Sequence, residues 1–107
     1  MTRFPCPYLH SEVELGDERE RHIAERHPDL LPDHQDRIAT TLADPDQVRR
    51  SKRFASARLF SRWYDDLKGG KYVAVVVVSA VDDGRHWIIT AYIARELAAG
   101  EVEWARN

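Results

Sequence analysis

The sequence predicts an α+β fold in which two N-terminal helices pack on a four-stranded antiparallel β-sheet. Two observations lead to this prediction. Apolar residues recur at helical spacing in the first part of the chain, as far as the turn sequence ADPDQ. From residue 47 onward the pattern has period two and is rich in β-branched and aromatic residues. A chain of 107 residues has room for one domain, so we expect a single unit with its core at about 13–104.

The first helix is expected over the sequence DERERHIAERH. Asp17 suits the N-cap, with Glu20 three residues later as its capping-box partner. Pro28 disfavours helical geometry at His27, so the helix is expected to end there. Ile23 is its clear apolar anchor into the core.

A second helix is expected to begin near Pro32, because proline suits the first helical position. Its buried stripe has helical spacing and consists of Leu31, His34, Ile38 and Leu42. The sequence ADPDQ ends this helix with a turn.

Four strands follow, joined by turns that contain DDLKGGK and VDDGR. They are expected at residues 47–51, 57–64, 72–79 and 87–93. The run YVAVVVV is apolar on both faces and belongs in the middle of the sheet. In the tail, Gly100 is expected to close a short helical turn, and Trp104 to fold back as a lid or a strand.

Charge is distributed unevenly behind a net charge of −2. Residues 12–46 hold eleven Asp/Glu against four Arg, whereas residues 47–64 hold six Lys/Arg and no acid. The basic segment has aromatic residues among its charges, as binding to a phosphate backbone and stacking on bases require. The alternative is an exposed sheet face whose arginines pair with the acidic helices. The basic residues of this segment are Arg49, Arg50, Lys52, Arg53, Arg58 and Arg62.

Several classes of protein are disfavoured by composition. The longest apolar run, YVAVVVV, is far shorter than the roughly 20 residues of a membrane-spanning helix. The first ten residues lack the apolar segment of a secretory signal, so a cytoplasmic protein is expected. Cys6 is the only cysteine, which excludes an internal disulfide and a thiolate metal cage. We expect no metal and no cofactor.

The polar residues of the strands and of the first helix suit metal-independent RNA cleavage. Histidine can move protons near neutral pH, and arginine matches the oxygens of a phosphate. In the strand at 57–64, alternation puts Arg58, Phe60 and Arg62 on one face. In the strand at 87–93, Thr90 and Tyr92 point away from an apolar face, which is formed by Trp87, Ile89, Ala91 and Ile93. The candidate catalytic residues are His22, His27, Arg62, Thr90 and Tyr92. The candidate nucleic-acid contacts are Arg26, Arg49, Arg50, Lys52, Arg53, Arg58 and Phe60. Each histidine is alternatively a helix-surface or capping residue.

The order of five segments resembles a family of small phage- and bacterium-associated domains, the barnase, EndoU, colicin and RelE-like (BECR) nucleases. These segments are HIAERHPDL, IATTLADPDQVRRS, ARLFSRWY, YVAVVVV and WIITAYIARELAAGEVEW. The resemblance covers residues 13–104 and implies a RelE-like α+β fold with metal-free ribonuclease or toxin-like activity. It places His22 and His27 at the family's helix histidines, and Thr90 with Tyr92 in its terminal strand. The chain departs from the family at Phe60 and Ser61, where a tyrosine is expected, and at Asp29, which replaces a glutamate.

The leading hypothesis is therefore a metal-independent endoribonuclease with RNA as its substrate. One alternative is an RNA-binding module without catalysis. Another is a protein-interaction domain, such as one half of a toxin and antitoxin pair or the target of an immunity-type protein. That domain would use an aromatic patch formed by Phe60, Trp63 and Trp104.

Overall fold

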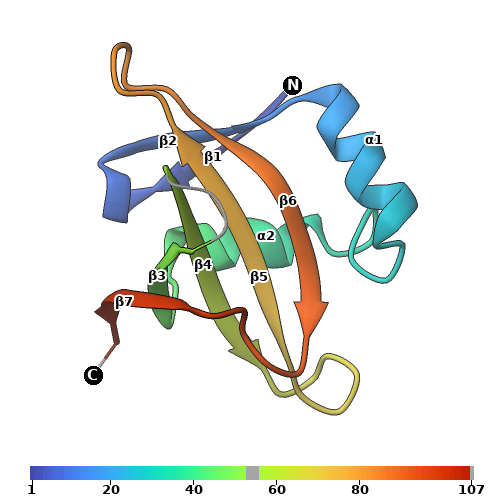
Figure 1. Cartoon of the computed structure of the whole chain (residues 1–107). Coiled ribbons are helices and arrows are strands. Elements are labelled where there is room, and N and C mark those ends of the chain that lie inside the picture. Colours follow the sequence, from blue (N-terminus) through green and yellow to red (C-terminus); the bar gives the residue numbers. More distant parts are fainter. Residues whose placement is uncertain (53–55, 107) are drawn as a thin grey trace.

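The structure, a computed structural model, describes residues 1–52 and 56–106 and forms one curved β-sheet with two α-helices (Figure 1). In chain order its elements are β1 (Thr2–Cys6), the 3-10 helix η1 (Pro7–Leu9), β2 (Ser11–Leu15), α1 (Asp17–Arg26), α2 (Gln35–Ala43), β3 (Gln47–Ser51), β4 (Ala57–Tyr64), β5 (Lys71–Ser79), β6 (His86–Ala94) and β7 (Gly100–Ala105). The described strands lie in the order β1-β2-β6-β5-β4-β3-β7. The sheet is mixed, because β2 runs parallel to β6 and every other pair is antiparallel.

The prediction of two helices on a four-stranded antiparallel sheet is wrong. The four predicted strands match β3, β4, β5 and β6, but a β1–β2 hairpin and β7 extend the sheet to seven strands. Strands make up 46% of the described residues and helices 21%. The hairpin strands are only five residues long, and Pro5 interrupts the first. An edge strand tolerates this proline because β1 pairs on one side alone.

Helix α1 begins at Asp17, with Gly16 as its N-cap. The prediction that Asp17 caps this helix is wrong, because its carboxylate instead binds the amino group of Met1 at 2.7 Å. The predicted end is confirmed, with His27 as the C-cap. The predicted start of the second helix near Pro32 is wrong, because residues 28–34 form turns and helix α2 begins only at Gln35.

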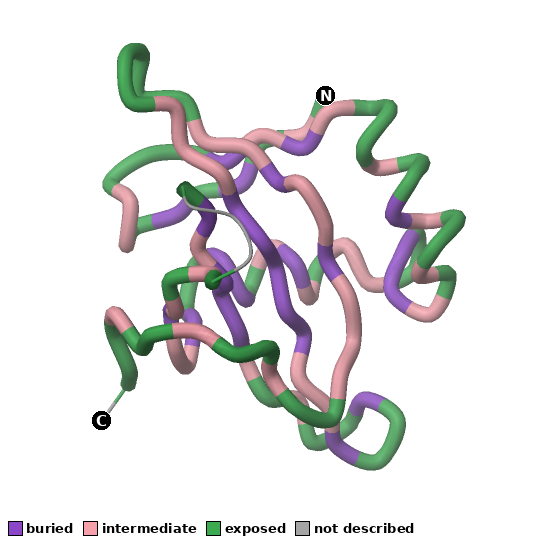
Figure 2. The backbone as a smooth tube through the Cα atoms, viewed as in Figure 1, coloured by how far each residue is buried: buried purple, intermediate pink, exposed green. Residues whose placement is uncertain are grey.

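The main core lies between the helices and one face of the sheet. Figure 2 shows buried positions along β5 and α2, whereas the tip of the β5–β6 hairpin is exposed. The core side chains that are fully buried include Leu15, Ile23, Leu30, Leu31, Ile38, Leu42, Phe60, Val75 and Ile88. Curvature brings the two ends of the sheet together, since the Tyr8 hydroxyl of η1 donates a hydrogen bond to Glu103 of β7 at 2.8 Å.

The opposite face of the sheet, which we call the open face, has a smaller apolar cluster. Its buried members are Ala57, Leu59, Ala74 and Val76. Ile89 packs against this cluster, so its predicted place on the core face is wrong. A register shift between Val76 and Val77 explains this, because it inserts one extra residue into β6 and reverses the alternation before it.

The tail forms an edge strand, β7, paired with β3. This bears out the strand alternative for Trp104, while the helical turn expected before Gly100 is absent from the described residues. An ideal Cβ on Gly100 would overlap the backbone oxygen of Arg50. Glycine is therefore required there for close pairing of the two strands, and not for closing a helix.

Candidate nucleic-acid interface

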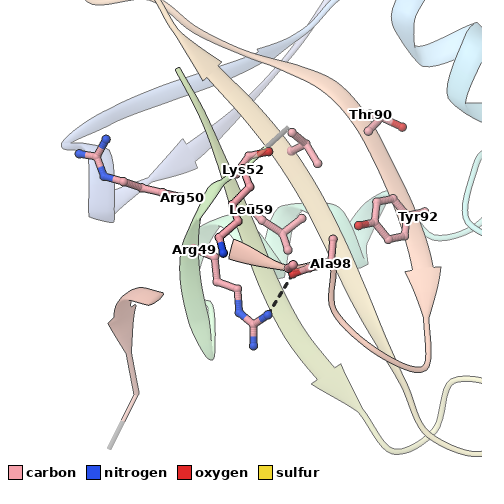
Figure 3. Close-up of a pocket in the computed structure, with 10 residues that line it drawn as sticks. Arg49, Arg50, Lys52, Leu59, Thr90, Tyr92 and Ala98 are labelled. Carbon is pink, nitrogen blue, oxygen red and sulfur yellow. Dashed lines mark hydrogen bonds between the residues drawn. The ribbon is translucent and has the colours of Figure 1, made fainter. Parts of the chain in front are cut away.

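A pocket of about 370 Å³ lies on the open face (Figure 3). It is lined by Arg49, Arg50, Ser51, Lys52, Leu59, Val76, Thr90, Tyr92, Ala98 and Ala99. Its floor is formed by the apolar side chains of Leu59 and Val76, which are only 4% and 8% exposed. Cationic and hydroxyl groups surround this floor. A floor that accepts a flat apolar ring, bordered by cations, suits one nucleotide of a single strand.

Strand register decides which side chains reach this pocket. Arg49 lies opposite Leu59, Leu59 opposite Val76, and Val76 opposite Thr90. Cross-strand partners share a face, so this row points to the open side. The neighbouring row, shifted by one residue, is Val48, Phe60, Val75 and Ala91, and it points into the main core.

Two hydrogen bonds fix the position of Arg49 at the pocket. Its Nε donates to Oε1 of Gln47 at 2.6 Å, and its Nη1 donates to the carbonyl oxygen of Ala98 at 3.0 Å (Figure 3). The loop before β7 therefore orients a guanidinium beside the pocket. Lys52 adds a second, exposed cation.

The end of α1 meets the pocket at Tyr92. The rings of His27 and Tyr92 have centroids 6.0 Å apart and an interplanar angle of 40°. His27 is half-buried because it ends the helix against β6, whereas His22 and Arg26 lie exposed along α1. Of the predicted catalytic residues, the structure thus brings together His27, Thr90 and Tyr92.

The other predicted residues of β4 point to the opposite face. Phe60 is fully buried and packs edge-on against Tyr8, with the ring centroids 5.8 Å apart, so it cannot stack on a base in this fold. Arg62 donates through Nη1 to the backbone oxygen and the carboxylate of Asp44, at 2.6 and 3.0 Å. Arg58 and Arg62 do not share a face with Thr90 and Tyr92, because their cross-strand partners are the core residues Val77 and Val73.

Glu103 of β7 holds two of the predicted arginines. Its Oε2 accepts from Arg58 Nε at 2.7 Å, and its Oε1 lies 3.1 Å from Arg50 Nε. Burial raises the pKa of Glu103, but hydrogen bonds from Arg58 and Tyr8 outweigh it and leave the pKa below its ordinary value. Burial, together with the hydrogen bond to Glu103, raises the pKa of Tyr8. The pair is thus a charged carboxylate and a neutral phenol at neutral pH.

Sequence reasoning missed the part of the pocket that comes from the tail. Ala98 and Ala99 lie in a loop where a helical turn was expected. Ser51 and Leu59 gave no signal, since small polar and apolar residues occur in any strand. Arg53, which was predicted as a nucleic-acid contact, lies outside the described residues.

The aromatic patch predicted for a protein partner is not assembled. Phe60 lies in the core, Trp63 packs on Tyr72 of the open face, and Trp104 packs beside Tyr8. An antitoxin or immunity-type partner stays a prediction. Within residues 1–52 and 56–106, no three His, Cys, Asp or Glu side chains form a group that could hold a metal ion.

No protein-family model, curated protein or solved structure matches this chain. The resemblance to the BECR nucleases therefore stays a prediction from sequence. The helical segments that the structure describes are too short and too polar to cross a membrane.

Proposed function

We propose that the protein is a metal-independent endoribonuclease and that its RNA strand lies across the open face. The observation that carries this proposal is the contact of His27 with Tyr92, which borders a pocket containing Arg49 and Lys52. His27 thus lies beside one wall of a pocket that also has two cations and an apolar floor. The reaction would take place in the cytoplasm.

The chemistry needs little from the protein because RNA carries its own nucleophile. The ribose 2′-oxygen attacks the adjacent phosphorus while His27 removes its proton. The bond from phosphorus to the 5′-oxygen of the next nucleotide breaks, and this oxygen takes a proton from solvent. The products are a 2′,3′-cyclic phosphate and a free 5′-hydroxyl.

The remaining groups have electrostatic and positioning roles. Arg49 is held in place by Gln47 and Ala98, so its charge is already oriented before the phosphate gains negative charge. Lys52 adds a second positive charge. The hydroxyl groups of Thr90 and Tyr92 are donors to phosphate oxygens, and Leu59 with Val76 supports the base.

The test compares two histidines of one helix. The wild type, His27→Ala and His22→Ala are incubated with mixed cellular RNA in EDTA, and the product ends are identified. We expect cyclic phosphate ends from the wild type and from His22→Ala, and a rate lower by about 10²–10⁴-fold for His27→Ala, the range for loss of a general base. Intact RNA with the wild type, or unchanged cleavage by His27→Ala, contradicts the proposal.

A second function, RNA binding without cleavage, is favoured by one observation. Only one of the two predicted histidines contacts a pocket residue among those that the structure describes. Binding that weakens with salt and with Arg49→Ala, with no turnover at any pH, would identify this function.

A further inference from the structure

A second pocket, which we call the hairpin pocket, lies at the base of the β5–β6 hairpin. Its volume is about 280 Å³. It is lined by Arg50, Ser56, Ala57, Arg58, Ser79, Ala80 and Val81. Two guanidinium groups and two hydroxyl groups from three strands and a loop therefore border one small hollow, and the proposed cleavage uses neither Ser79 nor Arg58.

The two arginines are preorganised by one carboxylate. Both approach Glu103 through Nε, at 2.7 Å for Arg58 and 3.1 Å for Arg50. One carboxylate faces two guanidinium groups, so the cluster keeps one excess positive charge. Arg58 is 26% exposed and Arg50 is 60% exposed, so an anion from solvent can reach them.

A serine on the wall of the hairpin pocket is also fixed. The Oγ atom of Ser79 lies 2.7 Å from Nδ1 of His86, its cross-strand partner. The site requires the form in which Nδ1–H of His86 donates to Oγ, because the single hydrogen of the Ser79 hydroxyl is then free to donate to an anion. A fixed hydroxyl beside two oriented guanidinium groups is the donor set that recognises the oxygens of a tetrahedral anion.

We propose that the hairpin pocket binds a phosphate group. Arg50 lines both pockets, and its cross-strand partner is Arg58, so an RNA strand that occupies both pockets would cross from one face of the sheet to the other at residues 50–52. On RNA, the hairpin pocket is a second phosphate subsite next to the cleavage site. This RNA role rests on the proposed function, whereas the binding of phosphate itself does not.

The first test uses inorganic phosphate and the amide NMR spectrum of the full chain. We expect saturable shifts at residues 56–58 and 79–81. Ser79→Ala should weaken binding by about 2–12-fold, the value of one hydrogen bond, and Arg58→Lys should also weaken it because lysine lacks the fork. The matched controls are Ser11→Ala and Arg21→Lys, at exposed positions on β2 and α1. No shift at these residues, or equal affinity for Ser79→Ala and Ser11→Ala, refutes the hairpin pocket as a phosphate site.

The second test separates a strand from a free anion. Affinity is measured for 2′-O-methyl oligoribonucleotides of increasing length, which lack the attacking hydroxyl, with the wild type, Ser79→Ala and Ser11→Ala. If RNA is the source of the phosphate, longer strands should bind more tightly to the wild type and to Ser11→Ala, and Ser79→Ala should lose this gain. Phosphate binding without any length effect removes the RNA role alone, and the absence of cleavage by the wild type removes only the proposed activity.

Discussion

The two faces of the central sheet differ in what they bury. Towards the helices, the row Val48, Phe60, Val75 and Ala91 is closed off from solvent. The adjacent row, displaced by one residue in each strand, consists of Arg49, Leu59, Val76 and Thr90. It has an apolar centre and polar ends. One face therefore buries the core and the other carries the pocket, and a shift of one residue decides which side chains lie on each.

The arginines on the two faces also differ in their hydrogen-bond and ion-pair partners. Arg49 points to the open face and is held by neutral oxygens of Gln47 and Ala98, so its charge is not neutralised by them. Arg58 and Arg62 point to the other face and are paired with Glu103 and Asp44. Basic residues that look equivalent in sequence therefore have different roles in the fold.

The substitution with the largest expected effect lies on the face of the sheet that packs against the helices. Phe60→Ala leaves a cavity in the main core and should lower the free energy of unfolding by ~3–5 kcal/mol. Leu59→Ala, next to it on the open face, should cost about 2 kcal/mol, at the low end for leucine, because its cluster is small and bordered by a pocket. Urea unfolding measures both. Equal losses would mean that the two faces contribute equally to stability.

The next largest loss of stability is expected where the edge strand β7 pairs with β3. Gly100→Ala should lower the free energy of unfolding by ~1–3 kcal/mol, because the added methyl group meets the backbone oxygen of Arg50. We expect faster amide hydrogen exchange at residues 100–105. Gly16→Ala is the control, since its methyl group would meet no atom within 4 Å, and it should leave exchange in β7 unchanged.

A third prediction sharpens the contrast between arginines. Arg49→Ala should reduce the slope of log affinity for single-stranded RNA against log salt by about 0.7, the value for one phosphate contact. Arg62→Ala should leave this slope unchanged, because Arg62 is bound to Asp44 on the opposite face. Filter binding at several salt concentrations distinguishes them. Identical slopes for the two variants would remove the open face as the RNA surface.

The smallest expected effect concerns pH. The pKa of Glu103 in the folded state is below its ordinary value of 4.5, so the unfolded chain binds its proton more readily. The stability that this carboxylate contributes is therefore fully present above pH 4.5 and is lost as pH falls through the lower, folded value. Glu103→Gln should be less stable than the wild type at pH 7, and the difference should shrink in acid. Thermal unfolding between pH 7 and pH 3 measures this, and a constant difference would contradict it.

Much of the local structure could be predicted from sequence. The end of α1 before Pro28 follows from the geometry that proline imposes on the preceding residue. The strands β3 to β6 follow from their period-two pattern and from the turn residues between them. The interaction of His27 with β6 could not be predicted, because it depends on how a helix end meets a strand more than sixty residues away.

The order of the amino acids is enough to identify the central strands, the basic character of residues 47–64 and the histidines of the first helix. Which of these side chains meet depends on how the strands pair in the folded chain. Register across β3, β4, β5 and β6 sends Arg49 and Thr90 to one face and Phe60 to the other, and the register shift at Val76 reverses the alternation of β6. The physical reason is that the two faces of a strand exchange with a shift of one residue, and cross-strand hydrogen bonds between distant segments fix that shift.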